Sequence, residues 1–144
     1  MARKIYETEA HRIAEQQVAD QLDLAWKCKC KKLAYKHIVD FAICRDGIIK
    51  GWVEVKTRKI SSTHLPEYMI SMHKMNYAFR LSKDTNLPFF LVVKFTDGLY
   101  YYKYNGEQHH LKWGGITKAY IRDSQDREPC YYINMNLFTK LLES

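Results

Sequence analysis

The sequence predicts an α/β (α+β) domain in which a central mixed β-sheet is flanked by helices. Three observations support this class. Apolar residues recur at helical spacing over residues 6–26 and 61–86, whereas residues 38–56 and 87–95 are rich in β-branched and aromatic residues. Hydrophobic residues make up 47% of the chain, and there are only 6 glycines and 3 prolines. This composition is typical of a folded globule and not of a disordered chain.

The first half of the chain is predicted to form one helix and three strands. Residues 6–26 form the helix, and the basic segment 27–37 forms a strand with its lysines exposed. Residues 38–44 and 48–56 form two more strands, joined by a hairpin turn at 45–47. The apolar face of the helix consists of Ala10, Ile13, Ala14, Val18 and Leu22.

The second half begins with a predicted helix over residues 61–86, with Pro66 in its first turn. Residues 87–95 are continuously apolar, which predicts a central strand covered on both faces. The helix carries an apolar stripe of Tyr68, Met72, Met75 and Phe79.

The C-terminal third is predicted to be mostly strand. Residues 99–105 and 109–113 form two strands, and residues 128–143 form a strand followed by a short closing helix. The predicted order is therefore α-β-β-β-α-β, with additional C-terminal strands and a short helix.

The 144 residues are predicted to form one domain, residues 1–144. The formal net charge is +7 and the isoelectric point is about 9.2, which favours binding to phosphate backbones or a simple basic surface. No signal peptide or membrane-spanning segment is visible, so we expect no membrane association and a cytoplasmic location. The four cysteines fit a reducing compartment without disulfides.

Three charged residues interrupt the most strand-like part of the chain. Glu54 and Lys56 alternate with Val55, so their side chains share one face. Whether Asp40 joins them depends on the turn. A two-residue loop would place Asp40 opposite Val53, with the two carboxylates on opposite faces. A β-bulge elsewhere would restore the shared face.

We predict instead a three-residue loop over residues 45–47, which places Asp40 opposite Trp52 and diagonal to Glu54. This register gathers the charges on one face. It assigns to the other face Val39, Phe41, Val53 and Val55.

Two carboxylates this close repel each other unless a cation neutralises them. Mg²⁺, or Mn²⁺ in its place, is a hard cation that takes oxygen ligands. Lys56 beside such an ion can hold or deprotonate an attacking water, or stabilise the charge that develops on phosphorus. The residue types therefore suit phosphodiester hydrolysis. The alternative is a surface ion pair between Lys56 and an acidic neighbour.

Asp40, a hairpin and then Glu54-Val55-Lys56 resemble the PD-(D/E)XK motif of the restriction endonuclease-like nucleases. The element order is also similar over roughly residues 5 to 95. The family's proline before the aspartate is Val39 here, which weakens the match. The resemblance implies that Asp40, Glu54 and the Val55 carbonyl bind Mg²⁺ or Mn²⁺.

The resemblance also implies that Lys56 assists the water. An acidic residue of the first helix completes the site in this family. Glu15 is our choice and Glu9 the alternative, with a solvated helix position open for both. A polar residue of the helix after the lysine strand reaches the phosphate in the family, so Ser71 and Lys74 are candidates, although a solvated position is favoured for both.

The resemblance is greatest to small members that process phage DNA or serve recombination and repair, including Holliday-junction resolvases. It implies a metal-dependent deoxyribonuclease with structure-directed or weakly sequence-specific cutting, and a homodimer. One competing hypothesis is a non-catalytic nucleic-acid-binding protein on the same fold. Another is a structural or protein-interaction domain.

Basic residues surround the predicted site and would contact phosphates without reading sequence: Lys27, Lys29, Lys31, Lys32, Arg58 and Lys59. Tyr100, Tyr102 and Tyr104 share one strand face, where packing is favoured over stacking on bases. His109 and His110 are predicted in a loop or at a strand end.

Overall fold

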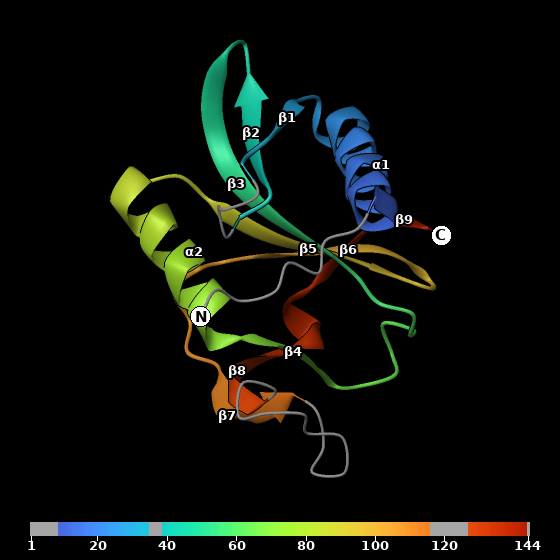
Figure 1. The fold of residues 1–144 in the computed structure, drawn as a ribbon, viewed down its shortest axis with the longest axis vertical. Coiled ribbons are helices and arrows are strands. Elements are labelled where there is room, and N and C mark those ends of the chain that lie inside the picture. Colours follow the sequence, from blue (N-terminus) through green and yellow to red (C-terminus); the bar gives the residue numbers. More distant parts are fainter. Residues whose placement is uncertain (1–8, 35–38, 116–126, 144) are drawn as a thin grey trace.

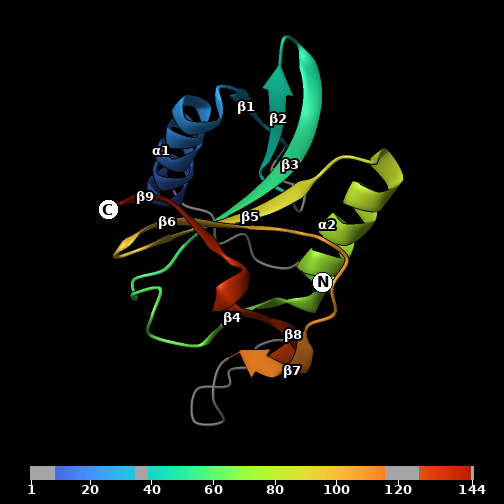
Figure 2. The ribbon, with the colours of Figure 1, turned by 180° about the vertical axis from the view of Figure 1, so that it is seen from behind.

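The computed structural model describes residues 9–34, 39–115 and 127–143, with two sheets and two α-helices (Figures 1 and 2). In chain order the elements are α1 (Glu9–Trp26), β1 (Lys29–Lys32), β2 (Phe41–Arg45), β3 (Ile48–Thr57), β4 (Glu67–Ser71), α2 (Met72–Thr85), β5 (Phe89–Phe95), β6 (Gly98–Lys103), β7 (His110–Gly115), β8 (Arg127–Asn134), a 3-10 helix (Met135–Leu137) and β9 (Thr139–Glu143). Within this part of the chain, no helix is long and apolar enough to cross a membrane.

The larger sheet has six strands in the order β1-β2-β3-β5-β6-β9, and β3 runs parallel to β5. The smaller sheet has the order β4-β8-β7. Figure 1 shows α1 and α2 on either side of the larger sheet, with the smaller sheet at the end away from the β2–β3 hairpin. The mixed sheet flanked by helices is the predicted fold class.

Two hydrophobic clusters lie on opposite faces of the larger sheet. On one face, Val18 and Leu22 of α1 pack with Val53 of β3. On the other, Met75 of α2 packs with Tyr68 of the smaller sheet. The central strand β5 contributes to both clusters, because Val92 belongs to the first cluster whereas Leu91 and Val93 belong to the second. The prediction of a central strand buried on both faces is confirmed.

The β2–β3 hairpin differs from the predicted register. Its turn is the two-residue loop Asp46-Gly47, and both residues have positive φ, 54° and 76°. A β-bulge between Ile43 and Cys44 then shifts the pairing, so that Phe41 lies opposite Val53. The predicted three-residue loop is therefore wrong. The bulge restores the parity that the loop was expected to supply.

Gly51 lies beside this bulge and has little room for a side chain. A Cβ there would approach the Pro88 carbonyl oxygen to 3.0 Å. Val39, which was expected on the same face as Phe41, instead packs in the cluster with α2. Val39 lies two residues before the first residue of β2, so it does not follow that strand's alternation, whereas the Asp40 N–H still donates to the Val53 carbonyl of β3.

The predicted helix over residues 61–86 is wrong in its first part. Residues 67–71 form β4, which pairs antiparallel with β8, and α2 begins at Met72. Tyr68 and Ile70 are buried from β4 while Met69 between them is exposed, which is the period of a strand. Pairing with a strand some 60 residues away in the chain overrides the helical spacing.

The predicted closing helix is also wrong beyond residue 137. Thr139–Glu143 forms β9, which pairs with β6 at the edge of the larger sheet. The strands predicted at 99–105 and 109–113 are present as β6 and β7, and His110 begins β7. The tyrosine face is packed as predicted: Tyr102 is 1% exposed, and the Tyr104 ring stacks on Phe79 with centroids 3.8 Å apart.

Candidate active site

Strand β3 provides the centre of the site through simple alternation. Val53 and Val55 face α1 in one hydrophobic cluster, so Glu54 and Lys56 face α2. The strand is ten residues long and pairs with β2 on one side and β5 on the other, which holds both charged side chains in place. The prediction that Glu54 and Lys56 share a face is confirmed.

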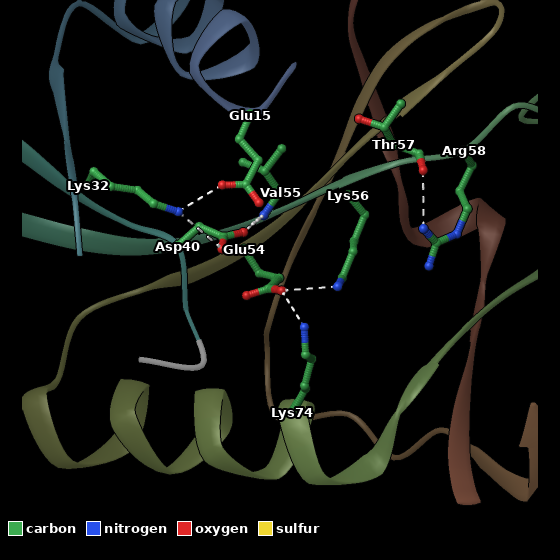
Figure 3. Close-up of polar contacts among 9 residues, drawn as sticks. All are labelled: Glu15, Lys32, Asp40, Glu54, Val55, Lys56, Thr57, Arg58 and Lys74. Atoms are coloured by element: carbon green, nitrogen blue, oxygen red, sulfur yellow. Dashed lines mark hydrogen bonds and ion pairs between the residues drawn. The ribbon is translucent and has the colours of Figure 1, made fainter. Parts of the chain in front are cut away.

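Glu54 is the most deeply buried charged group of the site, with 2% of its surface exposed. Its Oε1 lies 3.4 Å from Lys56 Nζ and 3.2 Å from Lys74 Nζ, the latter extending from the first turn of α2 (Figure 3). Its Oε2 is buried without a hydrogen-bond partner among the described residues. One oxygen of this carboxylate is therefore doubly paired, and the other remains available to a ligand.

Asp40 approaches the same strand from the chain before β2. The Val55 N–H donates a 2.7 Å hydrogen bond to Asp40 Oδ2. Burial, and then the nearby Glu54 charge, raise the pKa of Asp40 to about 7. In an extended strand the N–H and C=O of one residue point to the same edge, so the Val55 carbonyl also faces the edge where Asp40 lies.

The two lysines that flank Glu54 have opposite electrostatic tendencies. Burial and the Lys74 ammonium lower the pKa of Lys56, although Glu54 opposes them. Burial also disfavours the charge of Lys74, but the Glu54 carboxylate and hydrogen bonds outweigh it and raise its pKa. The surroundings thus favour the charged form of Lys74 and disfavour the charged form of Lys56.

Glu15 joins the site through a lysine. Lys32 Nζ lies 2.8 Å from Glu15 Oε2 and 3.8 Å from Asp40 Oδ1, and so links α1 to the residue before β2 (Figure 3). Glu9, the alternative, instead pairs with Arg12 at the exposed start of α1. Glu9 lines the same surface pocket as Glu15 and Lys32, but Glu15 is the acid that pairs with the lysine beside Asp40.

Tyr68 is a further member of the site, although its sequence spacing placed it in the apolar stripe of a helix. Its hydroxyl is the other buried side-chain polar atom without a partner among the described residues, besides Glu54 Oε2. Burial raises the pKa of Tyr68 to about 12, although the neighbouring Arg58 guanidinium lowers it; the Glu54 carboxylate also raises it and the Lys74 ammonium lowers it. The Tyr68 hydroxyl therefore lies within electrostatic range of Glu54 and Lys74, with Arg58 beside its ring.

The donor set suits a hard divalent cation. Asp40, Glu54 and the Val55 carbonyl offer only oxygen, which is what Mg²⁺ and Mn²⁺ prefer. A cation would offset the repulsion that raises the pKa of Asp40, and it would give Glu54 Oε2 a partner. The residues present therefore fit the metal that the motif implies.

The other predicted basic residues lie at varying distances from this centre. Lys29 and Lys31 are exposed on β1, on the face opposite to Lys32, and Lys59 is exposed after β3. The Arg58 guanidinium stacks over the Tyr68 ring at 5.4 Å. Ser71 donates a hydrogen bond to Glu128 at 3.3 Å.

Two members of the site had only weak signals in the sequence. Lys32 alternates with the buried Cys30, which places it on the α1 face of β1, but its contact with Asp40 is a tertiary feature. Tyr68 has helical spacing to the residues of α2, which concealed the strand β4. The proline before it and the alternation of Tyr68, Met69 and Ile70 were the signals for a strand.

A mixed sheet between two helices, with two acids and a lysine gathered on β3 and the chain before β2, defines a restriction endonuclease-like protein. A family model described as "phage putative PDDEXK endonuclease" matches residues 1–141, so the chain belongs to this PDDEXK endonuclease family. No curated protein has a significant match to the chain.

The fold is shared with a solved structure of low sequence identity. Hjc, a Holliday junction resolvase from the archaeal hyperthermophile Archaeoglobus fulgidus, is 10% identical to this chain and matches it with a TM-score of 0.53. The alignment covers 88% of this chain and 92% of that chain. The similarity establishes the restriction endonuclease-like fold.

Proposed function

We propose that this protein is a divalent-metal-dependent deoxyribonuclease that hydrolyses phosphodiester bonds at the Asp40–Glu54–Lys56 site. The observation that carries the proposal is the buried Glu54 carboxylate, which has two lysines on one oxygen and no partner among the described residues on the other. A structural ion pair would be expected to satisfy both oxygens. Membership in the PDDEXK endonuclease family supports the same conclusion.

Asp40, Glu54 and the Val55 carbonyl would hold Mg²⁺ or Mn²⁺. When bound, such an ion polarises a phosphoryl oxygen and increases the acidity of water. Lys56 Nζ, whose pKa is lowered, accepts a proton from the attacking water as its oxygen bonds to phosphorus. The bond from phosphorus to the leaving sugar oxygen breaks, and that oxygen takes a proton from solvent.

Lys74 and Tyr68 act on the phosphate in this proposal. The pKa of Lys74 is raised, so it remains a cation that can stabilise the charge developing on phosphoryl oxygens. The unpaired Tyr68 hydroxyl can donate a hydrogen bond to the same group. Glu15 acts through Lys32, which it holds beside Asp40. Lys29, Lys31 and Lys59 would position DNA through its phosphates.

The substrate we propose is branched or otherwise structured DNA. The family of phage endonucleases and the resolvase with the same fold support roles in recombination, repair or phage DNA processing. Cutting two strands of a four-way junction requires two catalytic sites, and each chain supplies one, so we propose a homodimer as the active form. Light scattering of the purified protein tests this: a monomeric mass with full junction cleavage contradicts it.

The central experiment incubates the protein with a four-way junction, single-stranded DNA and duplex DNA, each with Mg²⁺, with Mn²⁺ and with EDTA. We expect metal-dependent cleavage that is fastest on the junction and absent with EDTA. The Glu54→Gln variant should cleave roughly 10³-fold more slowly, whereas Asp20→Asn, at an exposed position of α1 away from the site, should retain activity.

Two further outcomes separate the alternatives. Binding to DNA that weakens steeply with salt, without cleavage in any metal, would establish a non-catalytic binding protein instead. Cleavage that persists in EDTA, or that is undiminished in Glu54→Gln, would overturn the metal site. Crystals soaked in Mn²⁺ should show anomalous signal between Asp40 and Glu54.

A further inference from the structure

A cavity of about 430 Å³ lies on the face of the larger sheet away from Glu54. It is bounded by the last turn of α1, the β2–β3 hairpin, and the adjoining ends of β5 and β6. In Figure 1 the last turn of α1 and the hairpin lie toward the same end of the molecule, away from the smaller sheet. Phe90, which lines the cavity, pairs with Val53 in the parallel β3–β5 ladder, and both side chains lie on the α1 face of the sheet. Glu54, the next residue of β3, faces α2 on the opposite side. The cavity is therefore separate from the candidate active site.

Three aromatic rings form the apolar wall of this cavity. Trp26 lies 4.9 Å from Phe90 and 5.5 Å from Tyr101 between ring centroids. All three side chains are only partly buried, so part of their ring surface is open to a ligand. An aromatic cluster of this kind offers flat, rigid surfaces on which another ring can pack.

Ile43 and Pro88 also line the cavity, together with three cations, Arg45, Lys50 and Lys103; no carboxylate belongs to the described residues that line it. Arg45 donates hydrogen bonds to the carbonyls of Trp26, at 2.8 Å, and Lys27, at 3.3 Å. These bonds tie the hairpin to the end of α1 and hold one cation next to the Trp26 ring. The cavity thus combines aromatic surface with a lining of positive charge.

We propose that this cavity holds an unpaired nucleotide of a single-stranded nucleic-acid segment. The base packs against Trp26 and Tyr101, while the adjoining phosphates contact Arg45, Lys50 and Lys103. The volume is in the usual range for small-molecule sites, roughly 300–1,000 Å³. A purely apolar ligand would leave the three cations unmatched, and a simple anion would leave the rings uncovered. The inference shares its ligand class with the proposed function but does not depend on cleavage.

Nuclear magnetic resonance of the nitrogen-15-labelled Glu54→Gln protein in EDTA tests the proposal, because neither cleavage nor metal binding then contributes. The three tryptophan indole signals are assigned with single Trp→Phe variants. Titration with a short oligodeoxythymidylate should shift the Trp26 signal at saturation. The exposed Trp113 of the smaller sheet is the internal control and should not shift.

The double variant Lys50→Glu/Lys103→Glu should weaken oligonucleotide binding and flatten its dependence on salt, by about 0.7 in logarithmic slope for each phosphate that the protein no longer neutralises. Lys83→Glu/Lys112→Glu changes the net charge equally at exposed positions outside the cavity and should bind as the parent does. Trp26→Ala should weaken binding roughly tenfold, because it removes the ring on which the base stacks.

An unchanged Trp26 signal at saturating oligonucleotide would overturn the proposal, as would an equal decrease of binding in both double variants. Equally tight binding of free thymidine monophosphate would indicate a mononucleotide site and would also overturn it. Cleavage by the wild type without a Trp26 shift would reject the cavity alone. A Trp26 shift without any cleavage would reject the nuclease alone.

Discussion

Two clusters of buried polar side chains differ in how completely their members are paired. The site cluster, Glu54, Lys56, Lys74 and Tyr68, leaves Glu54 Oε2 and the Tyr68 hydroxyl without partners among the described residues. The tyrosine cluster, Tyr102, Glu107 and His109, is closed: the Tyr102 hydroxyl donates to Glu107 and lies 2.8 Å from His109 Nε2. Both clusters are held by strands of the larger sheet and the segments that follow them.

The difference separates a fully paired cluster from the cluster in which we propose that a ligand binds. In the tyrosine cluster, burial and Glu107 raise the pKa of Tyr102, which keeps the hydroxyl a donor. The polar groups of its members pair with one another, and these contacts hold the connection between β6 and β7 in place. In the site cluster, burial without full pairing is unfavourable for the folded chain alone, and the proposed metal and phosphate would supply the partners that are missing.

The largest effect should come from removing the charge that the site cluster surrounds. Glu54→Gln should lower DNA cleavage by roughly 10³-fold, which corresponds to about 4 kcal/mol less transition-state stabilisation by the metal. Its melting temperature without metal should change only slightly, because the amide is less costly to bury than a carboxylate but leaves Lys56 and Lys74 without their counter-charge. A marked decrease in stability would show that Glu54 is structural, like the tyrosine cluster.

The second largest effect should be a dependence of the free energy of unfolding on pH, because Asp40 and Glu54 repel each other when both are ionised. The pKa of Asp40 is raised from 3.8 to about 7, so the folded protein binds more protons than the unfolded chain between these values. In EDTA, stability should fall by on the order of 3 kcal/mol as pH rises from 4 to 7, and then level off.

Asp40→Asn should lack this decline, and Asp20→Asn, at an exposed position on α1, should keep it. Excess Mg²⁺ should abolish it in the wild type, because the ion binds the ionised carboxylates. Denaturant unfolding at each pH makes the measurement. A stability that rises with pH over this window would contradict the raised pKa.

Replacing Lys56, the lysine that we propose accepts the proton, should have the next largest effect. Lys56→Met keeps most of the apolar stem but removes the amine, and should lower the single-turnover rate about 10²-fold with little change in DNA affinity. Lys83→Met, an exposed lysine near the end of α2 and outside the site, should retain the wild-type rate. Equal rates for both variants would remove Lys56 from the chemistry.

The tyrosine cluster should respond in the opposite way. Tyr102→Phe removes the hydroxyl that Glu107 and His109 share, and should lower the free energy of unfolding by about 2 kcal/mol while cleavage at low temperature is unchanged. Tyr101→Phe on the same strand is the matched control and should unfold as the wild type does. A catalytic defect in Tyr102→Phe would end the distinction between the two clusters.

The smallest effect should come from the edge of the site. Glu15→Gln weakens the hold on Lys32 and should lower cleavage roughly tenfold, as is usual for residues that act through a ligand's neighbour. The loss of cleavage should appear as a higher metal concentration needed for half-maximal activity. Asp20→Asn should be unaffected, and a defect of similar size there would indicate a general effect of charge on α1.

Local sequence patterns predicted several features correctly because they depend on alternation or composition. The shared face of Glu54 and Lys56 follows from the two-residue period of a strand. The central position of β5 follows from its continuous apolar run, which only a strand buried on both faces can accommodate. The packed tyrosine face of β6 follows the same alternation.

Other features could not be read in this way, because distant contacts decide them. Residues 67–71 have helical spacing, yet pairing with β8 makes them a strand and brings Tyr68 to the site. Thr139–Glu143 likewise becomes a strand because the edge of β6 is available to it. In both places the hydrogen bonds and burial gained from a remote partner exceed the local preference.

By itself, the sequence determined which side chains could do the chemistry and that two of them, Glu54 and Lys56, would face the same way. Only the tertiary structure decided how Asp40 reaches them, through a bulge at Cys44 and a hydrogen bond from Val55. It also decided that Lys32 and Lys74 arrive from other elements. Side-chain direction within a strand is a local property of the backbone, whereas the register between strands and the reach of neighbouring elements depend on the packing of the whole chain.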